Sequence, residues 1–455
     1  MLLLFALAAI WLVGGGLLAV LASVKLHAPG AWAECPWLGY GRLQPAAWNA
    51  FIYGFAAQAS IGAALWLTAR LSGAMLLGGR AIVLGTLFWN LGLKLGMWSI
   101  LSGLSTGLEG LEMPVYAIVT MLAGYLLIAA WAIITFSQRR VTEVFVSQWY
   151  VTAALFVFPW VLAAGTIMGV AIPLRGILQS SVQVWFIQNL YVLWLGFIGL
   201  AILYYLLPKL ADQPVPSRNL ALFGFWTLAL FGGLGGMARY QGGPFPAWMI
   251  SLGVVALVMS MFPIIAVALN LRGLRPAPSS SPAVARLARW SLFAYIAAGG
   301  LSALNAFGAV RRITQFTLVT PALDQLFLLG FVAPALWALL YYVVPQLTGR
   351  SWPWARLVSV HAGLAMSGSA LLVAAYGFGG WRQGVALNNP EVPFPSVVSG
   401  AVPFIGMGTL AYTLLWVGAL LFAGNLAAML GGLLVECVTR QSGGQTSSRR
   451  AEVGA

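Results

Sequence analysis

The chain has 455 residues, of which 61% are hydrophobic and only 7% are charged, with 23 basic and 9 acidic side chains. Because an ordinary soluble domain is about 25% charged, this composition excludes a soluble enzyme, a disordered chain and a nucleic-acid-binding domain. The net charge of +14 does not indicate nucleic-acid binding, since the basic residues stand between long apolar runs, as they do at the ends of membrane spans.

Continuous apolar runs dominate the chain, whereas β-barrels show short segments of alternating hydrophobicity. Since a spanning helix needs about 20 mostly apolar residues, the runs predict an all-α polytopic membrane protein with twelve transmembrane helices. In chain order, the predicted spans are residues 2–26, 46–69, 80–103, 113–137, 147–172, 182–207, 219–239, 247–271, 287–310, 320–346, 353–378 and 400–435. We expect a single membrane domain over residues 1–440 and a flexible cytoplasmic tail over residues 441–455.

The distribution of basic residues predicts the orientation of these spans. Fifteen of them fall on the side of the N-terminus, seven fall on the opposite side, and Lys94 lies inside a span. The positive-inside rule therefore places both termini in the cytoplasm.

Few side chains can carry chemistry. Metal and haem sites need clusters of imidazole, thiolate or carboxylate, and no such cluster is visible. His361 has no second histidine, cysteine or carboxylate near it in the sequence, which favours a helix-packing role. Lys94 in the third span is either functional or a lysine at a helix interface. From the residues alone, the chain is a membrane protein without a visible active site.

Several short strings follow one another along the chain. They are WLGYGRLQP at 37–45, VQVWFIQN at 182–189, YYLLPK at 204–209, PAW at 246–248, YYVVPQLTGR at 341–350 and RLVSVH at 356–361. Their order and spacing resemble subunit I, the catalytic subunit, of the C-type (cbb-type) haem–copper cytochrome c oxidases. The resemblance covers about residues 35–375. It implies the subunit I-like helix bundle of that superfamily, multi-pass in a bacterial inner membrane.

The family holds two haems and a copper through six histidines, and the resemblance places none of these histidines in this chain. The haem-ligand positions fall on Ala47, Leu323 and Gln325, and the copper-ligand positions fall on Gln188, Ala238 and Arg239. The family's tyrosine position falls on Tyr295, and its glutamate position falls on Leu301. The whole chain has only two histidines, so a misalignment does not explain the loss. We therefore expect no haem and no copper in this chain, and no catalysis by the family's mechanism.

The leading hypothesis is a cofactor-free scaffold subunit of a respiratory electron-transfer complex. Its expected partners are the lipid bilayer, membrane-anchored c-type cytochromes that carry haem c, and a genuine oxidase catalytic subunit. One alternative is an active cytochrome c oxidase or nitric oxide reductase subunit with unusual ligands. Another is a transporter or channel that reuses the emptied core.

Loss of the cofactors has two structural consequences. Large empty cavities are costly, so we expect neighbouring aromatic residues to fill the space. The candidates are Trp48, Phe51, Trp185, Phe186, Phe327 and Phe331. An unpaired Arg239 in the former copper site would also be unfavourable, so we expect it to approach Asp324 or to share a network with a nearby glutamine. The alternative is that Arg239 turns outward and Asp324 pairs with Arg311 or Arg312.

Overall fold

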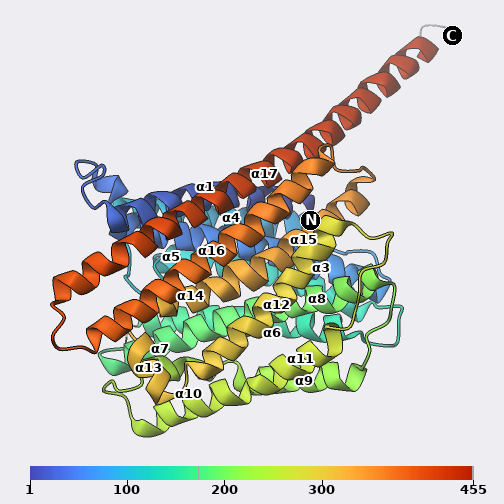
Figure 1. Ribbon diagram of the computed structural model, residues 1–455. Coiled ribbons are helices and arrows are strands. Elements are labelled where there is room, and N and C mark those ends of the chain that lie inside the picture. Colours follow the sequence, from blue (N-terminus) through green and yellow to red (C-terminus); the bar gives the residue numbers. More distant parts are fainter. Residues whose placement is uncertain (173, 453–455) are drawn as a thin grey trace.

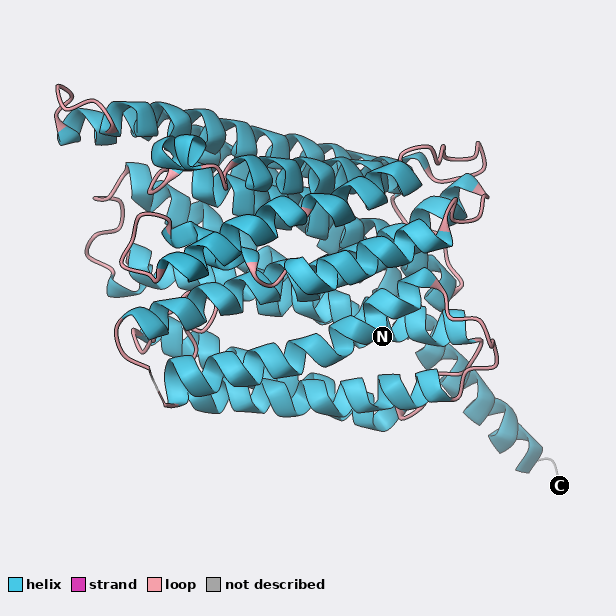
Figure 2. Ribbon diagram, turned by 90° about the horizontal axis from the view of Figure 1, so that it is seen from below, coloured by secondary structure: helices cyan, strands magenta, loops and turns pink. Residues whose placement is uncertain are grey.

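The computed structural model describes residues 1–172 and 174–452, and the side chains of the last helix up to residue 436. Every regular element in these ranges is a helix, and most helices run roughly along one direction (Figures 1 and 2). The elements are α1 (Leu2–His27), η1 (Pro36–Leu38), α2 (Tyr40–Asn49), η2 (Ala50–Ala56), α3 (Ala57–Ser72), α4 (Gly79–Ser102), α5 (Val115–Ser137), α6 (Val146–Thr166), η3 (Ile167–Ala171), α7 (Ile177–Gln188), η4 (Asn189–Leu195), α8 (Gly196–Ala211), α9 (Arg218–Phe231), η5 (Gly235–Tyr240), α10 (Ala247–Met259), α11 (Met261–Leu271), α12 (Pro282–Leu304), α13 (Gly308–Thr314), α14 (Val319–Gln325), η6 (Leu326–Val332), α15 (Ala333–Thr348), α16 (Ala355–Leu387) and α17 (Phe394–Glu452).

The predicted all-helical membrane fold is confirmed. Eleven helices of the described residues are long and apolar enough to cross a membrane, and they correspond to eleven of the twelve predicted spans. Three of them form the centre of the bundle: α2–η2–α3, α7–η4–α8 and α14–η6–α15, in which 94%, 89% and 89% of the most apolar window is buried. Because these three are enclosed by the other helices, their side chains line the interior.

The seventh predicted span, residues 219–239, is shorter than expected. Only Arg218–Phe231 is α-helical, and 14 residues reach about 21 Å, less than the roughly 30 Å of a bilayer core. The chain then passes through a glycine-rich turn, residues 232–234, and continues as the 3₁₀ helix η5. Hydropathy cannot distinguish this broken segment from a continuous helix because both are apolar.

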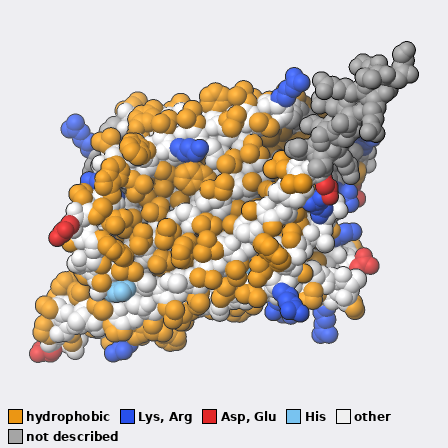
Figure 3. Space-filling view, turned by 90° about the horizontal axis from the view of Figure 1, so that it is seen from above, with side chains coloured by type: hydrophobic (Ala, Val, Ile, Leu, Met, Phe, Trp, Pro, Cys, Tyr) orange, Lys and Arg blue, Asp and Glu red, His pale blue; other side chains and the backbone are white. Residues whose placement is uncertain are grey.

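The N-terminus and the C-terminal end of the described part of α17 lie toward the same end of the bundle (Figures 1 and 2). Most charged side chains on the face in Figure 3 gather at the two ends, and hydrophobic side chains cover the middle. A membrane protein requires this distribution, because charge is costly within the hydrocarbon. The cytoplasmic location of the termini stays a prediction. The flexible tail also stays a prediction, since the backbone of α17 is helical to Glu452 and residues 453–455 lie outside the described residues.

Two glycines of α16 allow the segment before α14 to pack directly on this helix. A Cβ atom at Gly384 would overlap the carbonyl oxygen of Ile313, and one at Gly380 would overlap the backbone nitrogen of Val319. The Leu318 backbone N–H also donates a hydrogen bond to Gln383 Oε1 at 3.1 Å. These contacts fix the position at which α14 enters the bundle.

We predict that Gly384→Ala destabilises the protein by about 1–3 kcal/mol, because the added methyl group forces α16 away from the backbone at Ile313. Gly377→Ala, in the same helix, is the matched control, since a Cβ there meets nothing within 4 Å. It should leave stability unchanged or raise it by up to about 1 kcal/mol through helix propensity. Thermal unfolding of the purified variants measures both, and equal effects would contradict the packing described.

Candidate functional site

Each of the three central spans contains a π-helical segment of seven residues: η2, η4 and η6. Ala47 lies in the last turn before η2, Gln188 directly precedes η4, and Gln325 directly precedes η6. π-helical turns are rare and occur mainly at functional sites. The predicted ligand positions on the central spans therefore all lie beside a π-helical turn. Hydropathy does not reveal such turns.

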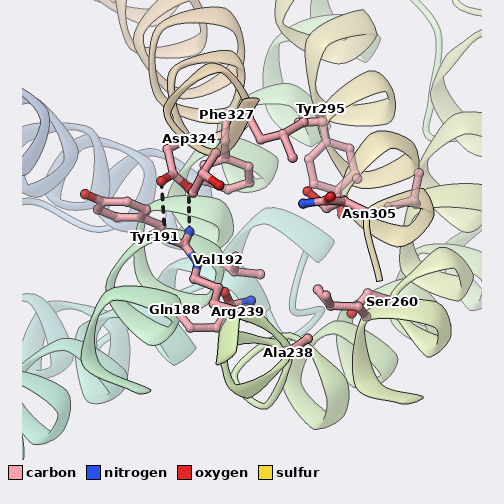
Figure 4. A pocket seen from close by; sticks show the side chains of 18 of the residues that line it. Gln188, Tyr191, Val192, Ala238, Arg239, Ser260, Tyr295, Asn305, Asp324 and Phe327 are labelled. Atoms are coloured by element: carbon pink, nitrogen blue, oxygen red, sulfur yellow. Dashed lines mark hydrogen bonds and ion pairs between the residues drawn. The ribbon is translucent and has the colours of Figure 1, made fainter. Parts of the chain in front are cut away.

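The predicted site residues separate into two cavities. The first, which we call the ion-pair cavity, has a volume of about 120 Å³ (Figure 4). Its lining includes Gln188, Ala238, Arg239, Leu323, Asp324 and Tyr295. The second, which we call the apolar slot, has a volume of about 60 Å³ and is lined in part by Ala47 and Gln325. The structure thus brings the three copper-ligand positions together with one haem-ligand position and places the other two haem-ligand positions in a separate cavity.

Leu301 does not belong to this site. Its side chain is 44% exposed on α12, whereas Tyr295 on the same helix is buried and faces the ion-pair cavity. Six residues correspond to about 600° of rotation in an α-helix, which places these two side chains on different faces. The position that the resemblance assigns to a glutamate therefore points away from the cavity.

Arg239 and Asp324 form an ion pair across the ion-pair cavity (Figure 4). The Arg239 guanidinium donates two hydrogen bonds, from Nη2 to Asp324 Oδ1 at 2.5 Å and from Nη1 to Oδ2 at 3.2 Å. The side chains are 27% and 17% exposed, so the pair is largely shielded from solvent. Such two-pronged contacts are among the stronger charge-assisted hydrogen bonds. The pair connects η5 to α14.

Amide side chains on α7 and its π-helical segment hold the glycine-rich turn that precedes η5. Gln188 Nε2 donates to the carbonyl oxygen of Gly232 at 2.8 Å, and Asn189 Nδ2 donates to that of Gly233 at 3.2 Å. A Cβ at Gly236 would lie 2.9 Å from the Gln188 Cβ, so the backbone approaches closely because glycine has no side chain. Gln188 is therefore committed to the turn and does not bond to the ion pair.

Two carboxylates next to the site, Glu109 and Glu112, were absent from the sequence-based prediction. Both lie in the loop between α4 and α5, and with Asp324 they line a cavity of about 250 Å³. Glu112 is 5% exposed, and its Oε2 accepts a hydrogen bond from Asn49 Nδ2 at 2.9 Å. Burial raises the pKa of Glu112 to about 7. Burial also raises the pKa of Glu109, as does the charge of Asp324, while Arg239 acts in the opposite direction.

The available signal for these carboxylates was their rarity, since they are two of only nine acidic residues in the chain. The remaining candidates lie elsewhere. Lys94 is exposed on α4. His361 is buried, and its Nδ1 lies 2.8 Å from the Tyr341 hydroxyl, among aromatic rings. Packing explains the position of His361.

The donor atoms at the predicted ligand positions do not fit a haem iron or a copper ion. Ala47, Ala238 and Leu323 have no side-chain atom that can bind a metal. Gln188 and Arg239 already donate to other groups. Gln325 Oε1 is buried without a hydrogen-bond partner, but one amide oxygen does not replace a set of imidazoles. No catalytic step through these cofactors follows from this site.

We predict that Asp324→Asn lowers the free energy of unfolding by on the order of 3 kcal/mol, because it leaves a largely buried guanidinium without its counter-charge. Glu143→Gln is the matched control, since it removes the carboxylate from the exposed Arg218–Glu143 pair. That change should cost at most about 1 kcal/mol. Chemical or thermal unfolding of the two variants measures the difference, and equal losses would show that the Arg239–Asp324 pair contributes little.

We predict that stability falls as the pH rises through the range in which Glu112 loses its proton. Since its pKa is raised from 4.5 to about 7 on folding, its contribution is fully present below about pH 4.5 and is lost by about pH 7. The free energy of unfolding falls by on the order of 3 kcal/mol over this range. Glu112→Gln keeps an acceptor for Asn49 and stays neutral, so it should weaken the pH dependence. Melting temperatures at acidic and alkaline pH test this; Glu143→Gln should keep the wild-type slope, and an unchanged slope in Glu112→Gln would refute the assignment.

Comparison with known proteins agrees with the arrangement of the helices. The family model described as Cytochrome C and Quinol oxidase polypeptide I matches residues 1–432. The chain is 26% identical to the Cbb3-type cytochrome c oxidase subunit CcoN1 of Stutzerimonas stutzeri over 446 residues, covering 89% of this chain and 91% of the relative. It is also 26% identical to the Cytochrome c oxidase subunit 1 of Rhodobacter capsulatus, covering 92% of this chain and 82% of the relative.

A solved structure, a cryo-EM structure of a heme-copper terminal oxidase dimer, shares the fold with a TM-score of 0.62 at 15% identity. The match covers 94% of this chain and 84% of the solved chain. Because the family model extends over nearly the whole membrane domain, this multi-span membrane protein belongs to the family of cytochrome c and quinol oxidase polypeptide I.

Proposed function

We propose that this chain is a cofactor-free member of its family that acts as a scaffold subunit in a respiratory electron-transfer complex of a bacterial inner membrane. The observation that carries the proposal is the Arg239–Asp324 ion pair. Arg239 occupies a position at which the resemblance places a copper ligand. Asp324 lies between Leu323 and Gln325, the positions of two haem ligands. A guanidinium donates hydrogen bonds and has no lone pair for a metal, so this arrangement favours a structural over a redox role.

The packing of the interior supports the same proposal. The two cavities, about 120 and 60 Å³, are small compared with the roughly 300–1,000 Å³ of typical cofactor and ligand sites. Trp48 and Phe51 line the apolar slot, and Phe327 lines the ion-pair cavity. Phe331 is fully buried against Tyr295, with ring centres 4.9 Å apart. Trp185 instead packs against Trp160, away from both cavities.

Hydrogen bonds within the chain join the elements that metal ligands connect in the family. The Arg239–Asp324 pair joins η5 to α14, and Gln188 joins α7 to the turn before η5. Trp48 Nε1 also donates to the Tyr191 hydroxyl at 2.6 Å, which joins α2 to η4 beside the apolar slot. These bonds join the central spans through the chain's own side chains, which supports a scaffold role.

The partners in this proposal are membrane-anchored c-type cytochromes, which supply haem c, together with a genuine oxidase catalytic subunit. In the proposed topology, α9 and η5 jointly make the twelfth crossing, since about 21 Å of α-helix and about 12 Å of 3₁₀ helix span a bilayer core. Both termini then lie in the cytoplasm, in agreement with the excess of basic residues at that end. The outer surface of the bundle, which is apolar, contacts lipid and the partner helices.

We predict that the chain, isolated from its complex, contains neither b-type haem nor copper. The test is a reduced-minus-oxidised spectrum with metal analysis, performed on the native complex and again after all cytochrome partners have been removed. A catalytically active family member purified in parallel serves as the positive control. A stoichiometric b-type band or copper that remains with the isolated chain would instead support an active oxidase or nitric oxide reductase subunit with unusual ligands.

A further inference from the structure

Two buried polar groups in the ion-pair cavity lack a partner. The Tyr295 hydroxyl has no hydrogen bond to the described residues, and Tyr295 is 4% exposed. Arg311 is 7% exposed, and its Nε also has no partner. Both residues line the cavity, from α12 and α13 respectively. Since unpaired buried donors are costly, the two together indicate that a ligand or ordered water completes the site.

The cavity has an excess of positive charge. Its charged lining residues are Arg239, Arg311 and Asp324, and Arg239 occupies both carboxylate oxygens of Asp324. Arg311 donates one hydrogen bond, from Nη2 to the Arg239 carbonyl oxygen at 2.7 Å, and forms no ion pair with the described residues. Burial, followed by the charge of Arg239, lowers the pKa of Arg311 to about 10, so it remains cationic at neutral pH. Arg311 is therefore left without an ion-pair partner among the described residues.

The cavity has room for a small molecule and a route by which one enters. A water molecule needs roughly 10–15 Å³ on the same measure, so about 120 Å³ accommodates an ion of a few atoms. An outer cavity of about 220 Å³ shares Arg239, Arg311 and Thr320 with it. Phe316, which is 85% exposed, lines the outer cavity and places it at the surface. Glu109 lines the outer cavity and the cavity that it shares with Asp324, and its charge acts on Arg239 rather than on Arg311.

We propose that the ion-pair cavity binds a small monovalent oxyanion, of the size of formate or nitrite, between the Arg311 guanidinium and the Tyr295 hydroxyl. A planar ion with two oxygens matches the geometry of a guanidinium, and one of its oxygens accepts the tyrosine hydrogen bond. A single negative charge pairs with Arg311, which has no other ion-pair partner among the described residues. This inference does not depend on the scaffold function, because it concerns only this chain's own side chains.

The test uses the purified full-length chain in lipid nanodiscs, in a buffer whose anion is gluconate, which is much larger than formate. Formate and nitrite are titrated at constant ionic strength and followed by calorimetry and melting temperature. We expect saturable binding and stabilisation in the wild type. Arg311→Gln should weaken binding at least about tenfold, and Tyr295→Phe should weaken it severalfold, since it removes only one neutral hydrogen bond.

Arg312→Gln is the matched control, because Arg312 is the adjacent arginine and is exposed. It should bind like the wild type. Absence of saturable binding, or equal affinity in Arg311→Gln, would overturn the proposal. If Arg311→Gln does not fold, the test rests on Tyr295→Phe. Unchanged affinity of that variant for formate and nitrite would then overturn the proposed site. Chloride binding as tight as formate binding, with no effect of Tyr295→Phe, would equally exclude an oxyanion site.

Discussion

A charged group inside a membrane bundle needs a partner of opposite charge, and Arg239 forms an ion pair with Asp324. The two residues lie 85 positions apart in the chain, and their side chains meet through two hydrogen bonds in a largely shielded cavity. The free energy needed to remove an ion from water is far larger than the free energy gained from a single neutral hydrogen bond. An unpaired charge of either residue at this position would therefore destabilise the fold. Three elements meet here: the ion pair joins η5 to α14, and Arg311 of α13 donates a hydrogen bond to the Arg239 carbonyl oxygen.

The surrounding structure makes the pair possible by bringing backbone close to backbone. The glycines between α9 and η5 let that turn lie directly on α7 and η4, where Gln188 and Asn189 donate hydrogen bonds to its carbonyl groups. On the other side, Gly384 lets α13 lie against α16, and Gly380 lets the start of α14 do so. Small residues at such crossings are typical of membrane helices, in which close packing replaces the hydrophobic effect as the main force between helices. The two contacts fix the elements that carry Arg239 and Asp324.

Hydropathy was sufficient to predict the helices that cross the membrane, because long apolar runs have no other stable arrangement there. It was insufficient at α9, where a glycine-rich turn breaks an apolar run, and at η2, η4 and η6, where the hydrogen-bonding pattern changes without a change in composition. The resemblance to the oxidase family selected residues that do gather around two cavities. It had no position for Glu109 or Glu112, which lie in the loop between α4 and α5. Leu301, which the resemblance aligns with a family glutamate, has an exposed side chain and lies outside both cavities.

The proposal requires that side-chain hydrogen bonds and ion pairs hold the bundle of this chain together. The most direct test is an experimental structure of the native complex at a resolution that shows side chains, with anomalous diffraction data at the iron and copper edges. The cofactor-free scaffold proposal predicts that the Arg239 guanidinium lies within hydrogen-bond distance of the Asp324 carboxylate and that no anomalous peak lies within the bundle of this chain. Density for a haem ring in the apolar slot, or an iron or copper peak in the ion-pair cavity, would contradict it.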